Sequence, residues 1–179
     1  LTLIQAVHEV DGIERIRLGS LEPGIITKEF AKAISSLPKV CPHFHLSLQS
    51  GCTATLKRMN RRYTAQEYRE KCERKYYPAP ALTTDVITGF PGETEEEFEE
   101  SRSFVDSIHF YETHIFPYSK REGTKAAVMP DQLPEQIKKE RSRVLIALGQ
   151  ERQREYMEQF LGKKKEVLFE EQQEIQGQT

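Results

Sequence analysis

The feature of this 179-residue sequence that most constrains its fold is a recurring order of strand, polar turn and helix. Apolar and polar patterning predicts strands at residues 13–18, 44–48, 82–89 and 112–118. Each strand is followed by a polar or glycine-containing turn, and helical spacing of apolar residues follows. Successive units of this kind give parallel strands with right-handed crossovers. We therefore predict an α/β fold, either an open sheet or a partial (β/α) barrel.

The helices are expected at residues 1–10, 27–37, 65–76, 94–108 and 135–161, with a short one after residue 52. Thr64 with Glu67 and Thr94 with Glu97 have the spacing of capping boxes. The helix at 65–76 is short for its layer, which suggests residues missing near Glu73. The apolar side of the last helix is expected to comprise Ile137, Val144, Leu145, Leu148, Met157, Phe160 and Leu161.

Unusual polar residues lie in or just after the carboxyl-terminal parts of the predicted strands, where parallel α/β folds bind their ligands. These residues are Ser20, Glu22, Gln49, Ser50, Asp85 and Tyr118. A cationic helix after the second strand adds Arg61. For Ser20 and Glu22, capping of the next helix is an equal alternative, and Arg61 with Arg62 is alternatively a solvated face.

A second candidate group is basic and lies after the last predicted strand. Lys120, Arg121 and Lys125 are candidates for contact with RNA phosphates, although exposed lysines are commonly just solvated. The formal net charge is −2, so nucleic-acid binding would depend on such a local patch.

The three cysteines, Cys41, Cys52 and Cys72, lack close-pair spacing, which argues against a disulfide framework and for a reducing compartment. Cys41, His43 and His45 alternate on one face of a predicted strand, but three ligands from one strand seldom surround a metal, so no metal site is assigned. The sequence has no apolar run long enough to cross a membrane, and we expect a cytoplasmic protein.

Four motifs in order carry a family resemblance: RIRLGSLEP, HLSLQSGC with LKRMNRRYT, TTDVITGFPGETEEEF, and FPYSKREGTKAA. Together they resemble the radical S-adenosylmethionine methylthiotransferases over nearly the whole chain. Within that family they look most like the enzyme that methylthiolates N6-threonylcarbamoyladenosine at position 37 of tRNA. Two further substrates stay open within the family, namely isopentenyladenosine-37 of tRNA and an aspartate of a ribosomal protein. A non-catalytic RNA-binding module is the alternative of another class.

The resemblance implies a domain division and a set of partners. Residues 1–161 would form the later part of the radical S-adenosylmethionine barrel, and residues 162–179 would begin a TRAM-like RNA-binding β-barrel domain. The cofactors would be S-adenosyl-L-methionine and two [4Fe-4S] clusters, whose ligands this sequence lacks. The chain would thus be a fragment, inactive alone, of an enzyme that acts on the tRNA anticodon loop.

The resemblance also implies roles for the polar residues at the strand ends. Gln49 and Ser50 would contact the ribose or the methionine end of S-adenosylmethionine. Arg61 would hold the methionine carboxylate, and Asp85 an ammonium or a ribose hydroxyl. Tyr118 would flank the adenine.

Overall fold

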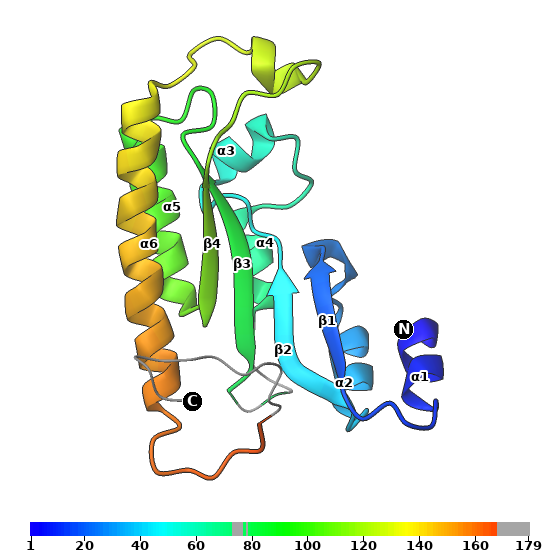
Figure 1. The fold of residues 1–179 in the computed structure, drawn as a ribbon. Coiled ribbons are helices and arrows are strands. Elements are labelled where there is room, and N and C mark those ends of the chain that lie inside the picture. Colours follow the sequence, from blue (N-terminus) through cyan, green and yellow to red (C-terminus); the bar gives the residue numbers. More distant parts are fainter. Residues whose placement is uncertain (73–76, 78, 168–179) are drawn as a thin grey trace, which may run out of the picture.

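The computed structural model describes residues 1–72, 77 and 79–167. It contains one sheet of parallel strands in the order β1-β2-β3-β4, so each strand pairs with the next one along the chain. The strands are β1 (Ile16–Leu21), β2 (Val40–Leu46), β3 (Ala81–Thr88) and β4 (Glu112–Pro117). The predicted α/β fold with parallel strands is confirmed, and the sheet is open (Figure 1).

The crossovers are helical, as expected for parallel strands. The helices are α1 (Thr2–His8), α2 (Lys28–Ser35), α3 (Thr53–Arg58), α4 (Ala65–Lys71), α5 (Glu95–Ile108) and α6 (Glu135–Glu158), with short 3-10 turns η1 (Pro23–Ile25) and η2 (Lys125–Val128). Both predicted capping boxes are present, since Thr64 and Thr94 accept from the backbone N–H groups of Glu67 and Glu97. No described helix is long and apolar enough to cross a membrane.

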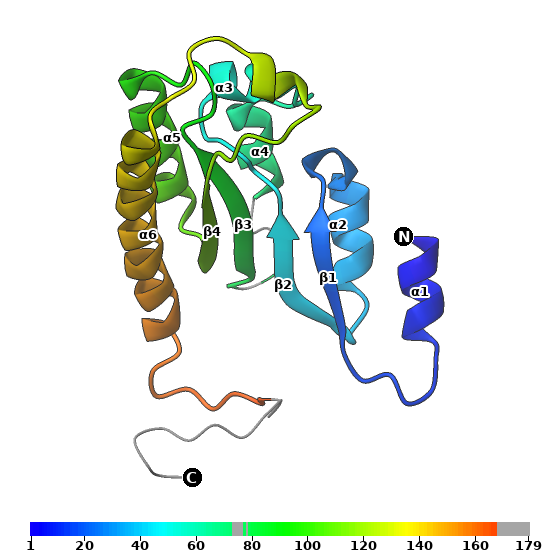
Figure 2. The same ribbon diagram turned by 45° about the horizontal axis from the view of Figure 1, so that its top comes forward.

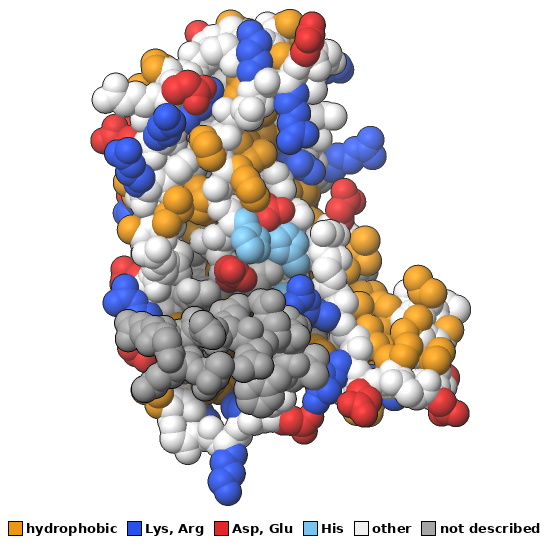
Figure 3. All heavy atoms as spheres, in the orientation of Figure 1, with side chains coloured by type: hydrophobic (Ala, Val, Ile, Leu, Met, Phe, Trp, Pro, Cys, Tyr) orange, Lys and Arg blue, Asp and Glu red, His pale blue; other side chains and the backbone are white. Residues whose placement is uncertain are grey.

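The hydrophobic core lies between one face of the sheet and its helices. It includes Phe44 and Leu46 of β2, Val86 of β3, Tyr68 of α4 and Leu145 of α6. Figures 1 and 2 show helices lying along one face of the sheet, with α6 beside β4 at the edge. The opposite face of the sheet is open, and histidine side chains gather near its centre (Figure 3).

Both ends of each of the first two predicted strands need correction. The first strand begins at Ile16 and continues to Leu21, so Ser20 lies inside β1 rather than in the turn after it. Ser20 has a φ of 53°, and the β1–β2 register shifts between Leu18 and Leu21. The second strand begins earlier than predicted, at Val40, and its ladder ends at Leu46.

The predicted apolar side of α6 is only partly correct. Leu145 and Leu148 are buried, but Ile137, Val144 and Met157 are largely exposed. The buried face instead includes polar residues, namely Lys138, Arg141 and Ser142. The reason is that this part of α6 packs beside the polar loop that follows β3. The predicted gap near Glu73 and the domain boundary after residue 161 concern segments that lie largely outside the described residues.

Candidate functional site

The site begins with a cavity beyond the carboxyl ends of β2, β3 and β4. Gln49, Asp85 and Tyr118, three of the predicted site residues, line it together. Ile87, Phe90 and Phe116 supply apolar walls, and Arg121 lies at the same cavity. The open space measures about 1050 Å³. A polar residue from each strand end beside aromatic rings is a composition typical of a small-molecule site.

Gln49 reaches this cavity because the chain continues the β2–β3 ladder after β2 formally ends. Its N–H donates to the Asp85 carbonyl at 2.9 Å, and its own carbonyl accepts from Ile87 N–H at 2.9 Å. The backbone φ of Gln49 is 70°, a conformation unusual for a residue other than glycine and costing on the order of 1–3 kcal/mol. Such strain concentrates at functional sites, where it aims a side chain.

Ser50 is placed differently from Gln49. It is fully buried, and its Oγ accepts a hydrogen bond from Cys52 N–H at 3.2 Å. It is not among the residues that line the cavity, so its local contact is with the turn before α3. A cofactor role for Ser50 stays a prediction from the resemblance.

Tyr118 forms one wall of the cavity at the end of β4. Its ring is buried and meets the Phe90 ring edge-on, with 5.3 Å between centroids. Lys138 Nζ lies 5.4 Å from the ring centroid. The Tyr118 hydroxyl is buried and has no hydrogen-bond partner within the described part of the chain. An unsatisfied buried hydroxyl is costly, which makes it a candidate group for contact with a ligand.

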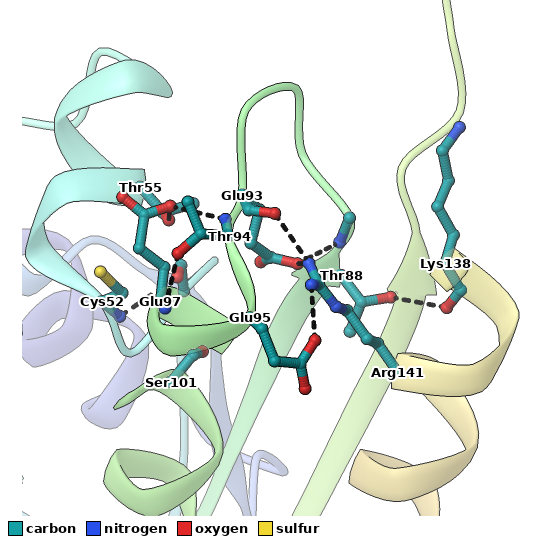
Figure 4. Close-up of polar contacts among 12 residues, drawn as sticks. Cys52, Thr55, Thr88, Glu93, Thr94, Glu95, Glu97, Ser101, Lys138 and Arg141 are labelled. Atoms are coloured by element: carbon teal, nitrogen blue, oxygen red, sulfur yellow. Dashed lines mark hydrogen bonds and ion pairs between the residues drawn. The ribbon is translucent and has the colours of Figure 1, made fainter. Parts of the chain in front are cut away.

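The loop between β3 and α5 carries Phe90 and is held by a buried ion pair (Figure 4). Glu93 accepts from Gly89 N–H at 2.7 Å and from Arg141 Nη1 at 2.7 Å, and Arg141 Nη2 also donates to Glu95 at 2.9 Å. Burial raises the pKa of the Glu93 carboxyl, while these donors oppose the rise. The loop therefore has a fixed geometry before any ligand arrives. The sequence predicted a turn here but not the ion pair, because Arg141 lies far along the chain.

A second ion pair holds α3 against the start of α5. Arg58 donates to both carboxylate oxygens of Glu97, with Nη1 2.8 Å from Oε1. These hydrogen bonds lower the pKa of Glu97. The sequence predicted only the capping-box contact between Glu97 and Thr94, whereas the structure adds Arg58 of α3 as a partner.

The open face of the sheet, next to the cavity, holds a polar cluster that was not predicted from the sequence. His45 Nε2 lies 3.3 Å from Asp85 Oδ2, and His45 Nδ1 lies 2.9 Å from Thr83 Oγ1. His114 lies on the neighbouring strand, in register with Asp85. Its ring centroid is 5.9 Å from that of His45. The sequence alone did not reveal this cluster, because its residues are distant in the chain and only the pairing register of the strands brings them together.

A second, polar cavity covers this cluster. It is also lined by Arg17, Ser20, His43 and Glu112, and it shares Asp85 with the first cavity. Burial and the neighbouring Arg17 lower the pKa of His43. Ser20, one of the predicted site residues, thus lies near Asp85 but at the second cavity.

The remaining predicted residues lie away from the lining of both cavities. Glu22 precedes η1 without a side-chain cap, and Arg61 is exposed after α3. Lys120 and Lys125 are exposed near Arg121 in the segment after β4. Their roles in binding cofactor or RNA stay predictions.

The cysteines do not form a cluster site. Cys52 is buried with its Sγ 3.2 Å from Glu100, Cys72 is buried in the core, and Cys41 lies on β2. In the described part of the chain, the group of three possible metal ligands that comes together contains no cysteine. An iron–sulfur cluster needs several thiolates around one point, so the residues present do not fit one.

Comparison with known proteins agrees with this geometry. The sequence model described as Radical SAM superfamily matches residues 2–105, more than half of the chain. The chain belongs to this superfamily. A solved radical SAM enzyme, coproporphyrinogen III oxidase (HemN) from Escherichia coli, has the same fold with a TM-score of 0.62 at 16% identity. That match covers 77% of this chain and 32% of the oxidase.

Relatives with two different tRNA substrates are similar to this chain. A tRNA-2-methylthio-N(6)-dimethylallyladenosine synthase from Caldicellulosiruptor saccharolyticus is 44% identical over 93% of this chain and 36% of its own length. The threonylcarbamoyladenosine tRNA methylthiotransferase MtaB of Bacillus subtilis is 44% identical over 90% of this chain and 36% of its own length. The chain therefore spans about a third of these relatives. Homology to radical SAM tRNA methylthiotransferases, expected from the motifs, is confirmed.

Proposed function

We propose that this chain is part of a radical SAM enzyme that methylthiolates N6-threonylcarbamoyladenosine at position 37 of tRNA. The observation that carries the proposal is the cavity lined by Gln49, Asp85 and Tyr118, in a chain similar to tRNA methylthiotransferases over most of its length. A module that only binds RNA would have no need of this cavity.

Several groups that line the cavity support binding of S-adenosylmethionine. Asp85 offers a carboxylate to an ammonium or hydroxyl group, and the Gln49 amide can both donate and accept. The apolar side chains of Phe90 and Phe116 suit an adenine ring. When bound, S-adenosylmethionine supplies the radical that activates a carbon–hydrogen bond of the substrate adenine. This chain's own share is to bind and orient the cofactor and to exclude water.

The iron–sulfur clusters of such an enzyme would need ligands from outside these 179 residues, because Cys41, Cys52 and Cys72 do not fit a cluster. We expect two [4Fe-4S] clusters in the intact protein, meaning the whole polypeptide that carries this chain. The chain alone is then expected to be inactive. A TRAM-like domain beginning near residue 162 would contribute to RNA binding.

The choice of substrate is supported by the motifs and by the polarity of the second cavity. Threonylcarbamoyl carries a carboxylate, a hydroxyl and a urea group, whereas dimethylallyl is purely apolar. Arg17, Ser20 and His43 line the cavity next to Asp85 and can donate hydrogen bonds to the former. A dimethylallyl group would desolvate these polar residues without replacing their hydrogen bonds. Modification of dimethylallyladenosine, the activity named for equally similar relatives, is the second candidate.

Contact with tRNA would involve the segment after β4. Arg121 lies at the cofactor cavity, and Lys120 and Lys125 are exposed close by in sequence. This position suits phosphates of the anticodon loop next to the modified base. Such contacts weaken as salt rises, because bound phosphates release counterions.

Calorimetry of S-adenosylmethionine binding to the intact protein tests the cavity. We expect Asp85→Asn to raise the Kd about tenfold, equivalent to about 1.4 kcal/mol, through loss of a charge-assisted hydrogen bond. Gln49→Ala should weaken binding in the same direction. Glu122→Gln, an exposed change in the neighbouring loop, is the matched control. Unchanged affinity in both cavity variants would refute this cofactor site.

A further inference from the structure

We propose that His45, Asp85 and His114 form a binding site for a late first-row divalent metal such as Zn²⁺. One nitrogen or oxygen of each residue lies within 4.8 Å of the others. Two imidazoles and one carboxylate are a ligand set common for such metals, and carboxylate-only sites for Mg²⁺ or Ca²⁺ have a different composition. The proposal does not rest on the tRNA activity proposed above.

The sheet holds the three ligands on adjacent strands. Asp85 of β3 pairs in register with His114 of β4, and His45 of β2 pairs with Thr83, two residues before Asp85. Alternate residues of a strand point to the same face, which brings all three side chains to the open face. Small side-chain rotations would bring the ligand atoms to a common metal, since Zn–N and Zn–O bonds measure about 2.0–2.2 Å.

A hydrogen bond orients the first ligand. Thr83 is buried, and its Oγ1 lies 2.9 Å from His45 Nδ1. This leaves Nε2 on the side of Asp85, 3.3 Å from Oδ2. Metal-bound histidines characteristically use their other ring nitrogen in this way, which fixes the tautomer and the ring plane.

The cavity leaves space for further metal ligands. His45 and Asp85 are partly buried, while His114 is exposed at the cavity wall. Three protein ligands with an open side are the arrangement of metal sites that bind water or another small molecule. Arg17 and Glu112, which also line the cavity, carry opposite charges, so the neighbourhood does not repel a cation strongly.

A simple ion pair between His45 and Asp85 is the competing explanation. It accounts for two of the groups but leaves His114 without a role. In the described part of the chain, the His114 side chain has the ring contact with His45 and no hydrogen bond or ion pair. A third ligand at this position is what distinguishes a metal site from an ion pair.

The test is equilibrium dialysis of the intact protein, with its clusters reconstituted, against Zn²⁺ alone, followed by zinc-edge X-ray absorption. We expect a bound zinc with nitrogen and oxygen neighbours at about 2.0–2.2 Å, without the sulfur distance of about 2.3 Å that cysteine gives. His114→Gln should abolish this binding. Thr83→Val, which alters only the orienting contact, should weaken it by roughly 10–100-fold.

His109→Gln is the matched control, because His109 lies at the end of α5 beside Glu155 and away from the cluster. Iron content and the thermal midpoint should stay the same in all three variants, which shows that the fold and clusters are retained. The proposal fails if His114→Gln binds zinc as the wild type does, if the bound zinc has only sulfur neighbours, or if no zinc binds. Asp85 lines both cavities, so S-adenosylmethionine affinity is measured in His114→Gln, which changes a residue of the second cavity alone. Loss of zinc with unchanged S-adenosylmethionine affinity in this variant would support a metal site that is distinct from the proposed cofactor contacts.

Discussion

At the residue scale, the candidate site depends on a few charged groups that reach across elements. Glu93 and Arg141 hold the loop that carries Phe90, and Glu97 holds α3 through Arg58. Removing one partner of such a pair costs more than the pair contributes, because the other charge is left without its hydrogen bonds. These positions are therefore expected to be sensitive to substitution although their side chains do not line either cavity.

The loss of unfolding free energy caused by Glu97→Gln should depend on pH. Hydrogen bonds from Arg58 lower the pKa of Glu97 in the folded protein below its ordinary 4.5. The stabilisation is therefore present above pH 4.5 and is lost as the pH falls through the lower, folded-state value. We expect the variant to lose about 1.5–3 kcal/mol of unfolding free energy at pH 7.

Urea titrations of wild type and Glu97→Gln at several pH values measure this difference. It should shrink steadily below pH 4.5. Glu140→Gln, an exposed change on α6, is the control and should change stability little. A difference that stays constant down to pH 3 would show that the ion pair is not the source.

Sequence reasoning at the residue scale selected Gln49, Asp85 and Tyr118, and the structure places all three at one cavity. Gln49 and Tyr118 directly follow a strand or its extension, whereas Asp85 lies inside β3. The same reasoning missed Glu93–Arg141 and the His45–Asp85–His114 cluster. These contacts join residues that lie far apart in the chain, and only the register of the strands and the position of α6 bring them together. Local spacing carries no information about either.

At the element scale, the turn after β2 must approach α5 closely. A Cβ atom at Gly51 would lie 2.7 Å from both the Ser101 carbonyl oxygen and Phe104 Cβ. Gly51 N–H also donates to Ser101 Oγ at 2.8 Å. The glycine in this motif is thus required for packing, and the contact sets the position of the chain immediately after Gln49.

Gly51→Ala is expected to destabilise the protein by about 1–3 kcal/mol, since the methyl group meets backbone atoms that cannot rotate away. Gly24→Ala is the matched control, because nothing lies within 4 Å of a Cβ atom there. Thermal and urea unfolding of both variants provide the comparison. Equal stability of the two would contradict the close approach of this turn to α5.

The elements themselves were largely predictable, since capping boxes and helical spacing identified where α4 and α5 begin. The predicted end of α4 near residue 76 was wrong, because the helix ends at Lys71. Other errors occurred where local pattern and tertiary packing disagree. Ile137 and Val144 have helical spacing but are exposed, because α6 directs Lys138 and Arg141 toward the loop after β3. Burial of α6 is decided by its neighbours and not by its own apolar stripe.

At the scale of the whole molecule, an open parallel sheet has its helices on one face and its polar groups on the other. The carboxyl ends of the strands carry the proposed cofactor cavity, and the open face carries the histidine cluster. The order of strands and helices made this layout predictable. The edge at which the cofactor binds stays a prediction. Substrate identity was not predictable from the layout, because relatives with different substrates are equally similar to this chain.

The proposed function of the intact protein is methylthiolation of threonylcarbamoyladenosine in tRNA. Its most direct test is mass spectrometry of tRNA nucleosides from cells with the gene deleted and then restored, using wild type or Asp85→Asn. We predict loss of the 2-methylthio form of threonylcarbamoyladenosine alone, recovery with wild type, and reduced recovery with Asp85→Asn. Persistence of this nucleoside in the deletion strain, or loss of the methylthio form of dimethylallyladenosine instead, would contradict the account.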